Sequence, residues 1–188
     1  MDRYACIGDV LSRMEPITLE EMNPVKLMNR TDTKYLTNWQ TLQQMARHWE
    51  SLFFVQDING LRKARYTTLY FDTPDAITYT IHHNQHLMRQ KVRQRHYLDT
   101  GNIFIEVKNK VNTGRTKKKR IEIPESAWGD LYSYPEMAAF LRQKVWITDQ
   151  PMLPRLQNFF ERVTLVNKAR TERITIDSNI RFKNKVSE

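Results

Sequence analysis

Residues 89–97 read RQKVRQRHY, a stretch in which basic and uncharged side chains alternate. Because successive side chains of a strand point to opposite faces, an extended chain here places four cations in one row. Like charges in a row repel one another, so the pattern predicts an anionic partner on that face. The row consists of Arg89, Lys91, Arg93 and Arg95, and Tyr97 ends it.

The net charge of the chain is concentrated around this stretch. The formal net charge is +9, and the window from Arg89 to Arg120 contains eleven Lys and Arg residues against only Asp99 and Glu106. The rest of the chain is therefore balanced, and the expected anionic partner binds locally. Nucleic acid, a membrane surface and a polyphosphate all fit the charge alone.

The composition predicts one domain over residues 1–188, since 188 residues with 40% hydrophobic side chains can bury an ordinary core. No stretch approaches the roughly 18 uninterrupted apolar residues of a membrane span, and the N-terminus lacks a basic-then-apolar signal layout. We therefore expect no membrane span in this chain and a cytoplasmic protein. No P-loop, dinucleotide fingerprint or Ser-His-Asp arrangement is present. The sequence leaves the oligomeric state open.

Alternation of charged and apolar side chains recurs along the chain. Residues 104–110 and 117–123 flank a turn with Asn112 and Gly114, which predicts a hairpin with one charged and one apolar face. Further strands are predicted in residues 25–37, 65–73, 162–168 and 173–182, and helices in residues 7–14, 38–49 and 126–145, with a helix or loop in 74–85 and a further helical turn or two in 151–160.

This order of elements predicts an α+β fold, an antiparallel β-tunnel formed by a closed or nearly closed barrel with helices packed outside. In a barrel the cations face one another, and two unit charges about 6 Å apart repel by roughly 3 kcal/mol at an effective dielectric of 20. An anion must then neutralise them, and a linear phosphate chain suits Lys and Arg donors. An open sheet, whose charges face water, is the alternative.

Aromatic side chains bear on the choice among anions. A single-stranded nucleic acid is usually bound with aromatic platforms for its bases, whereas the cationic rows carry only Tyr97. The pattern therefore argues against nucleic acid and for phosphate without bases. Three histidines, His82, His83 and His86, have near-helical spacing that could suggest a metal site, but no carboxylate or cysteine lies beside them. A solvated loop is the favoured interpretation.

The set of segments resembles a known family, the VTC (vacuolar transporter chaperone) polyphosphate-polymerase domain of the triphosphate tunnel metalloenzyme, or CYTH-like, superfamily. The resemblance runs from about residue 30 to residue 182 and rests on the order and spacing of the segments. These are RTDTKY (30–35), TLYFDTPD (68–75), RQKVRQRHY (89–97), FIEVKNK (104–110), KKKRIEI (117–123) and RITID (173–177), with Arg162 before the last.

The resemblance implies an eight-stranded tunnel in which inward cations bind ATP, triphosphate or polyphosphate. Polymerase members transfer the γ-phosphate of ATP to a polyphosphate chain, a phosphotransferase reaction that uses Mn2+ or Mg2+. The catalytic residues it implies are Lys34, Arg93, Arg95, Lys108, Arg162 and Arg173. The phosphate-binding residues it implies are these six together with Lys91, Lys110, Lys118 and Arg120. Candidate metal ligands are Glu106, Asp32 and Glu122. These carboxylates share faces with Lys and Arg residues, so balancing the charge of those cations is their favoured role.

Two departures from the family pattern bear on the reaction. Superfamily members usually open with ExExK, whereas this chain has Arg30 at the first acidic position. Members also continue into a final strand with a metal-binding glutamate, which we expect this chain to lack. The alternatives to a polymerase are therefore an inorganic or organic triphosphatase of the same superfamily and a non-catalytic polyanion-binding module, with RNA binding as a weaker third.

Overall fold

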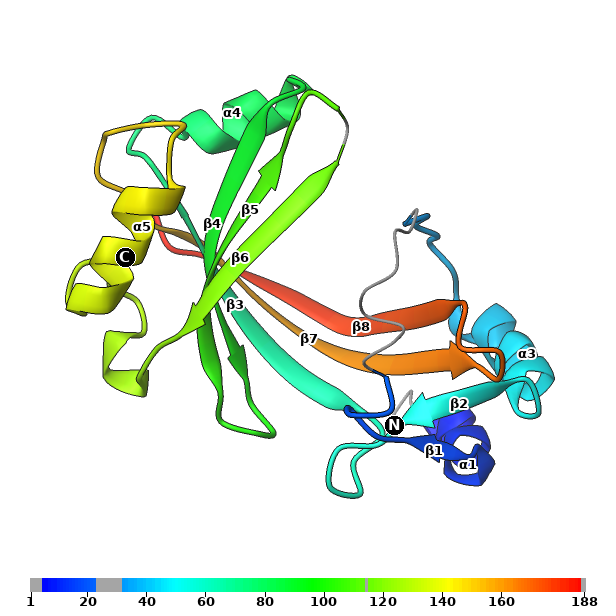
Figure 1. Ribbon diagram of the computed structural model, residues 1–188. Coiled ribbons are helices and arrows are strands. Elements are labelled where there is room, and N and C mark those ends of the chain that lie inside the picture. The colour runs from blue at the N-terminus through cyan, green and yellow to red at the C-terminus, as the bar shows by residue number, and fades with distance from the viewer. Residues whose placement is uncertain (1–4, 23–31, 114, 187–188) are drawn as a thin grey trace. The chain divides into compact units, whose positions relative to one another are not determined.

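The computed structural model describes residues 5–22, 32–113 and 115–186 (Figure 1). Its elements follow in the order α1 (Ala5–Arg13), β1 (Pro16–Ile17), α3 (Trp39–Trp49), β2 (Phe53–Gln56), β3 (Ala64–Asp72), α4 (Ile77–His83), β4 (Arg89–Tyr97), β5 (Ile103–Lys110), β6 (Thr116–Glu122), the 3-10 helix η1 (Glu125–Ala127), α5 (Pro135–Lys144), β7 (Leu153–Asn167) and β8 (Arg173–Asn184).

The strands form one sheet in the order β1-β2-β7-β3-β4-β5-β6, and β8 pairs with β7. Strand β3 is antiparallel to β4, β4 to β5 and β5 to β6, as is β2 to β7, whereas the two-residue β1 runs parallel to β2. The predicted α+β class with an antiparallel sheet is confirmed. The predicted hairpin is β5 and β6, with Lys108 opposite Lys118.

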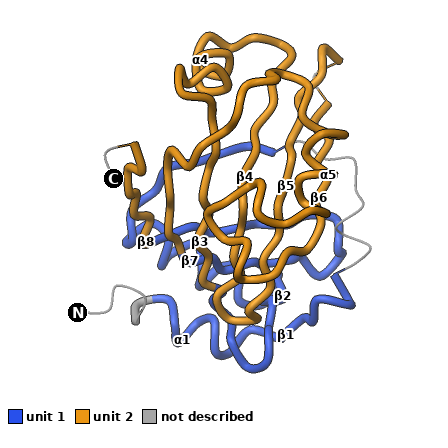
Figure 2. The backbone as a smooth tube through the Cα atoms, turned by 90° about the vertical axis from the view of Figure 1, so that its left-hand side faces the viewer, with its two compact units in different colours: residues 1–64, 161–178 blue, residues 65–160, 179–188 orange. Residues whose placement is uncertain are grey.

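The chain divides into two compact units, each described by itself (Figure 2). Unit 1 comprises residues 1–64 and 161–178, and unit 2 comprises residues 65–160 and 179–188. Strands β7 and β8 contribute residues to both units. The single domain over residues 1–188 stays a prediction.

In unit 1, helices α1 and α3 pack on the sheet through apolar side chains. The buried residues of this core include Leu11 of α1, Leu42 of α3, Val55 of β2 and Val163 of β7. Helix α3 begins behind Asn38, whose side chain accepts a hydrogen bond from the backbone N–H of Thr41 at 2.9 Å, as the capping pattern predicts.

In unit 2, α5 covers one face of the sheet. The even-numbered side chains of β4 lie on this face, where Val92 packs with Val107 and with Met137 of α5. Gln90 and Gln94 are fully buried here and bind backbone groups, as in the 2.8 Å hydrogen bond that Gln94 donates to the carbonyl of Ala127. The helix-covered face thus takes every second residue of β4 and leaves the odd-numbered cations on the other face.

Several sequence-based elements differ from the structure. Residues 32–37 of the predicted strand 25–37 form no strand, and residues 25–31 lie outside the described residues. The prediction of helical turns in residues 151–160 is wrong, because β7 begins at Leu153. Only α5 and η1 of the predicted helical stretch 126–145 are helical. Within residues 5–22, 32–113 and 115–186, no helix has the length and apolar character to cross a membrane.

Candidate anion-binding site

The face of unit 2 opposite α5 carries the predicted cations in cross-strand rows. Lys91 lies opposite Lys108, which lies opposite Lys118. In the neighbouring row Arg93 opposes Glu106, and Glu106 opposes Arg120. We call this surface the cationic face; it consists of Arg89, Lys91, Arg93, Arg95, Lys108, Lys110, Lys118 and Arg120, all on β4, β5 and β6.

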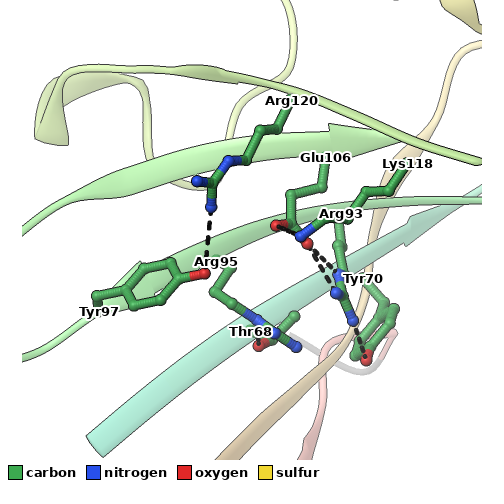
Figure 3. Close-up of polar contacts among 8 residues, drawn as sticks. All are labelled: Thr68, Tyr70, Arg93, Arg95, Tyr97, Glu106, Lys118 and Arg120. Carbon is green, nitrogen blue, oxygen red and sulfur yellow. Dashed lines mark hydrogen bonds and ion pairs between the residues drawn. The ribbon is translucent and has the colours of Figure 1, made fainter. Parts of the chain in front are cut away.

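Glu106 is the buried acid at the centre of the cationic face (Figure 3). Its side chain is 0% exposed; Oε2 accepts hydrogen bonds from Arg93 at 2.7 and 2.8 Å, and Oε1 accepts one from Lys118 at 2.9 Å. Burial raises the pKa of Glu106, but Arg93 and Lys118 outweigh it and lower the pKa to about 2. This carboxylate therefore balances two cations and holds their side chains in place.

The predicted metal ligands differ in their surroundings. Glu106 is occupied by Arg93 and Lys118, and Glu122 accepts a hydrogen bond from Asn102 at 2.7 Å. Asp32 is exposed, lies outside any strand and belongs to unit 1. Among the residues that the structure describes, no group of three or more His, Cys, Asp or Glu side chains is placed to hold a metal ion. The donor set does not fit a metal held by the protein alone, and metal binding by these residues stays a prediction.

Ionisation of Glu106 is expected to make stability pH-dependent. A folded-state pKa of about 2, below the ordinary 4.5, contributes about 3 kcal/mol that is present above pH 4.5 and lost as the pH falls through 2. Urea unfolding at about pH 5 and about pH 2.5 measures most of this loss. Glu106→Gln, which cannot ionise, should lose about 2 kcal/mol less than the wild type over this interval, because Glu106 is still largely ionised in the folded protein at pH 2.5. Equal losses in the two proteins would contradict the assignment.

Among the described residues, Arg95 is a cation without an acidic partner. Its guanidinium lies 5.8 Å from the ring centroid of Tyr66 and 5.6 Å from that of Phe160, and its Nε donates to Thr68 Oγ1 at 3.1 Å. Burial, followed by the charge of Arg93, lowers the pKa of Arg95. No carboxylate among the described residues bonds to Arg95, so most of its fork of donors is available to an anion.

Lys91 has a similar environment. Burial and the neighbouring charges of Lys108, Arg89 and Arg93 lower the pKa of its ammonium. Within the described part of the chain, no acidic side chain forms an ion pair with Lys91. Partly buried cations that lack a counter-ion are costly, and a bound anion removes that cost.

The expectation that Tyr97 is the only aromatic side chain among the cationic rows is wrong. Tyr66 and Tyr70 of β3 and Phe104 of β5 share the face with Tyr97, because they pair with odd-numbered β4 residues. Tyr66 is buried and stacks on Phe160 at 5.0 Å, and the Arg120 guanidinium lies 4.3 Å from the Phe104 centroid. These rings contact arginine side chains, so they orient guanidinium groups of the cationic face.

The remaining predicted residues lie in unit 1. Arg162 of β7 forms a two-pronged ion pair with Asp177 of β8, at 2.5 and 2.7 Å. Arg173 begins β8 and is half-buried. Lys34 is exposed and lies outside any strand, not on the predicted first strand. Their participation in phosphate binding stays a prediction.

Two residues around the cationic face, Thr68 and Tyr70, were missed from sequence, and His82, for which a solvated loop was the favoured interpretation, lies on helix α4. Thr68 bonds to Arg95, Tyr70 accepts a hydrogen bond from Arg93 at 3.3 Å, and His82 of α4 lies within electrostatic range of Lys91. Alternation within residues 65–73 was the available signal for Thr68 and Tyr70, because both occupy even-numbered positions of one strand. His82 is brought to the face by tertiary packing, which no local pattern reports.

Comparisons with known proteins bear on the family of this chain. A search of curated proteins gives no match. Among solved structures, the Hippeastrum protein HpAC1, described as revealing a dominant triphosphatase activity, is 14% identical over 77% of this chain and 76% of that chain, with a TM-score of 0.40. The family model of the VTC domain matches residues 29–187, which contain every strand of the cationic face. The resemblance drawn from the strand motifs is thereby confirmed: this chain belongs to the VTC domain family.

Proposed function

We propose that this chain binds triphosphate and polyphosphate on the cationic face and acts as a polyphosphate polymerase, transferring the γ-phosphate of ATP to a polyphosphate chain. The observation that carries the proposal is the pair Arg95 and Lys91, two partly buried cations with no acidic partner among the described residues. ATP as the donor places the reaction in the cytoplasm.

Each cation has a physical role in this proposal. The fork of Arg95 donates two hydrogen bonds to one phosphate, while Lys91 neutralises the next as a compact charge. Glu106 holds Arg93 and Lys118 in position before the substrate binds, so binding does not have to order these two side chains. Phosphoryl transfer requires positioning and charge neutralisation above all, which these groups supply. Lys34, Arg162 and Arg173 remain further proposed ligands.

We propose that Mn2+ or Mg2+ binds together with the substrate. Both ions bind phosphate oxygens, and Mg2+ is commonly held by substrate phosphates plus one or two carboxylates. Because Glu106 is committed to Arg93 and Lys118, we expect the ion to arrive as its complex with the triphosphate.

The commitment of Glu106 also favours one alternative, a non-catalytic polyanion-binding module. The fully buried carboxylate of the face serves two cations, which suits tight binding without any chemistry. A triphosphatase needs the same cations and differs only in the acceptor, which is water.

Incubation of the protein with ATP and Mn2+ distinguishes these functions by their products. The proposal predicts long-chain polyphosphate and ADP, resolved on a gel. Free phosphate without polymer would identify a triphosphatase, and ATP binding without turnover would identify the module; either result overturns the polymerase. Arg95→Gln is the variant expected to lose polymer formation, with Lys117→Gln, on the other face of β6, as its matched control.

A further inference from the structure

Helix α4 places a histidine beside one end of the cationic face. The helix contacts β4, and the Nδ1 atom of its His82 is buried with no hydrogen-bond partner among the described residues. The neighbouring His83 differs, since it is exposed and stacks on Tyr79 with the ring centroids 5.7 Å apart. His82 is thus the histidine whose polar atom is enclosed and unsatisfied.

The charges that act on His82 are all basic. They come from Lys91 and Arg89 of β4, from Lys108 of β5 and from His83 on its own helix. Burial is the largest influence and the cations add to it, so the pKa of His82 lies below its ordinary value. Protonation of the imidazole is therefore disfavoured while the cationic face is empty.

We propose that His82 is a further phosphate-binding residue, which takes up a proton from solvent when a phosphate chain occupies the end of the cationic face formed by Arg89, Lys91 and Lys108. The inference rests on the proposed function. The only bond change is a proton transfer from solvent: an O–H bond of hydronium breaks and an N–H bond of the imidazole forms. The charge of the imidazolium then balances part of the negative charge of the phosphate chain.

Phosphate oxygens bring negative charge to this end of the cationic face. An anion within about 4–6 Å stabilises the charged form of a neighbouring base, which reverses the effect of the three cations. The ligand must be long, because Arg95 and Arg89 lie six residues apart on β4, about 20 Å at 3.4 Å per residue. A chain that contacts both Arg95 and His82 is therefore a linear polyphosphate with several units.

The sign of the pH dependence follows from the two states. Binding raises the pKa of His82 from its depressed value, so between the free and the bound pKa the complex holds up to one additional proton. Affinity for polyphosphate therefore rises as the pH falls through this interval, by up to tenfold per pH unit from this residue. The protonation of the polyphosphate itself is common to all variants and cancels in the comparison.

The test is calorimetric titration with medium-chain polyphosphate, in buffers of different ionisation enthalpy, at pH values on both sides of about 6.5. His82→Asn is compared with the wild type, and His83→Asn is the matched control. We expect the wild type and His83→Asn to take up as much as one proton more than His82→Asn. Equal proton uptake by His82→Asn and the wild type would overturn the inference, whereas absence of binding to the wild type would overturn the proposed function as well.

A second measurement needs no variant. NMR titration of the His82 ring in the wild-type protein should show its pKa rising when polyphosphate is added. An unchanged or lowered pKa of His82 in the complex would overturn the inference even if His82→Asn fails to fold.

Discussion

Replacing Arg95 by glutamine is expected to weaken tripolyphosphate binding at least about 100-fold while the protein stays folded. Two charge-assisted hydrogen bonds from one guanidinium are worth about 3 kcal/mol, which corresponds to more than a hundredfold in Kd. Because Arg95 has no carboxylate partner among the described residues, its replacement leaves no buried acid unpaired. Calorimetric titration measures the affinity, and thermal unfolding followed by circular dichroism checks the fold.

The matched controls for this variant are Lys117→Gln and Lys119→Gln. These side chains pair with Asn109 and Val107 and therefore project to the other face of β6, and both are exposed. They remove the same charge from the same sheet in unit 2, so a loss of general electrostatic attraction affects all three variants alike. Losses as large for Lys117→Gln as for Arg95→Gln would show that the face assignment is wrong.

Arg93→Ala is expected to destabilise the fold by about 3–5 kcal/mol, the loss typical of breaking a buried ion pair. Its side chain is 16% exposed and its partner Glu106 is 0% exposed, so removing Arg93 leaves a buried carboxylate with Lys118 as its remaining ion-pair partner among the described residues. The free energy of unfolding in urea measures the effect.

The double variant Arg93→Met with Glu106→Leu separates the pair from its members. Replacing both charges by apolar groups of similar volume removes the unpaired acid, so the double variant should be more stable than Arg93→Ala alone. It should nevertheless bind tripolyphosphate more weakly than the wild type, because Arg93, a proposed phosphate-binding residue, has been replaced. A loss of stability below about 1 kcal/mol in Arg93→Ala would contradict the structural role given to Glu106.

The two faces of β4, β5 and β6 could be predicted from sequence because alternation is a local property. Gln90, Val92 and Gln94 had to share a face once the segment was extended, and all three are fully buried. The odd-numbered cations of this segment then had to lie on the other face. The alternation within the predicted hairpin placed Lys108 and Lys118 on its charged face, and the two residues are paired in the structure.

Cross-strand and tertiary contacts could not be predicted in the same way. That Glu106 bonds to Arg93 and Lys118 depends on the register of three strands, which no single segment encodes. The aromatic neighbours of Arg95 come from β3 and β7, far apart in sequence. Residues 151–160 were misjudged because their two prolines and apolar side chains fit a helical turn as well as a strand, and pairing within the sheet decided the outcome.

The central claim is that the cationic face binds a chain of phosphates, and calorimetric titration of the whole chain with tripolyphosphate tests it most directly. Titrations with and without Mn2+, each at low and at physiological salt, separate binding by the cations from binding assisted by the metal. The account predicts saturable binding without metal that weakens as salt rises, because the contacts are between charges. Absence of binding at low salt, with and without Mn2+, would contradict it.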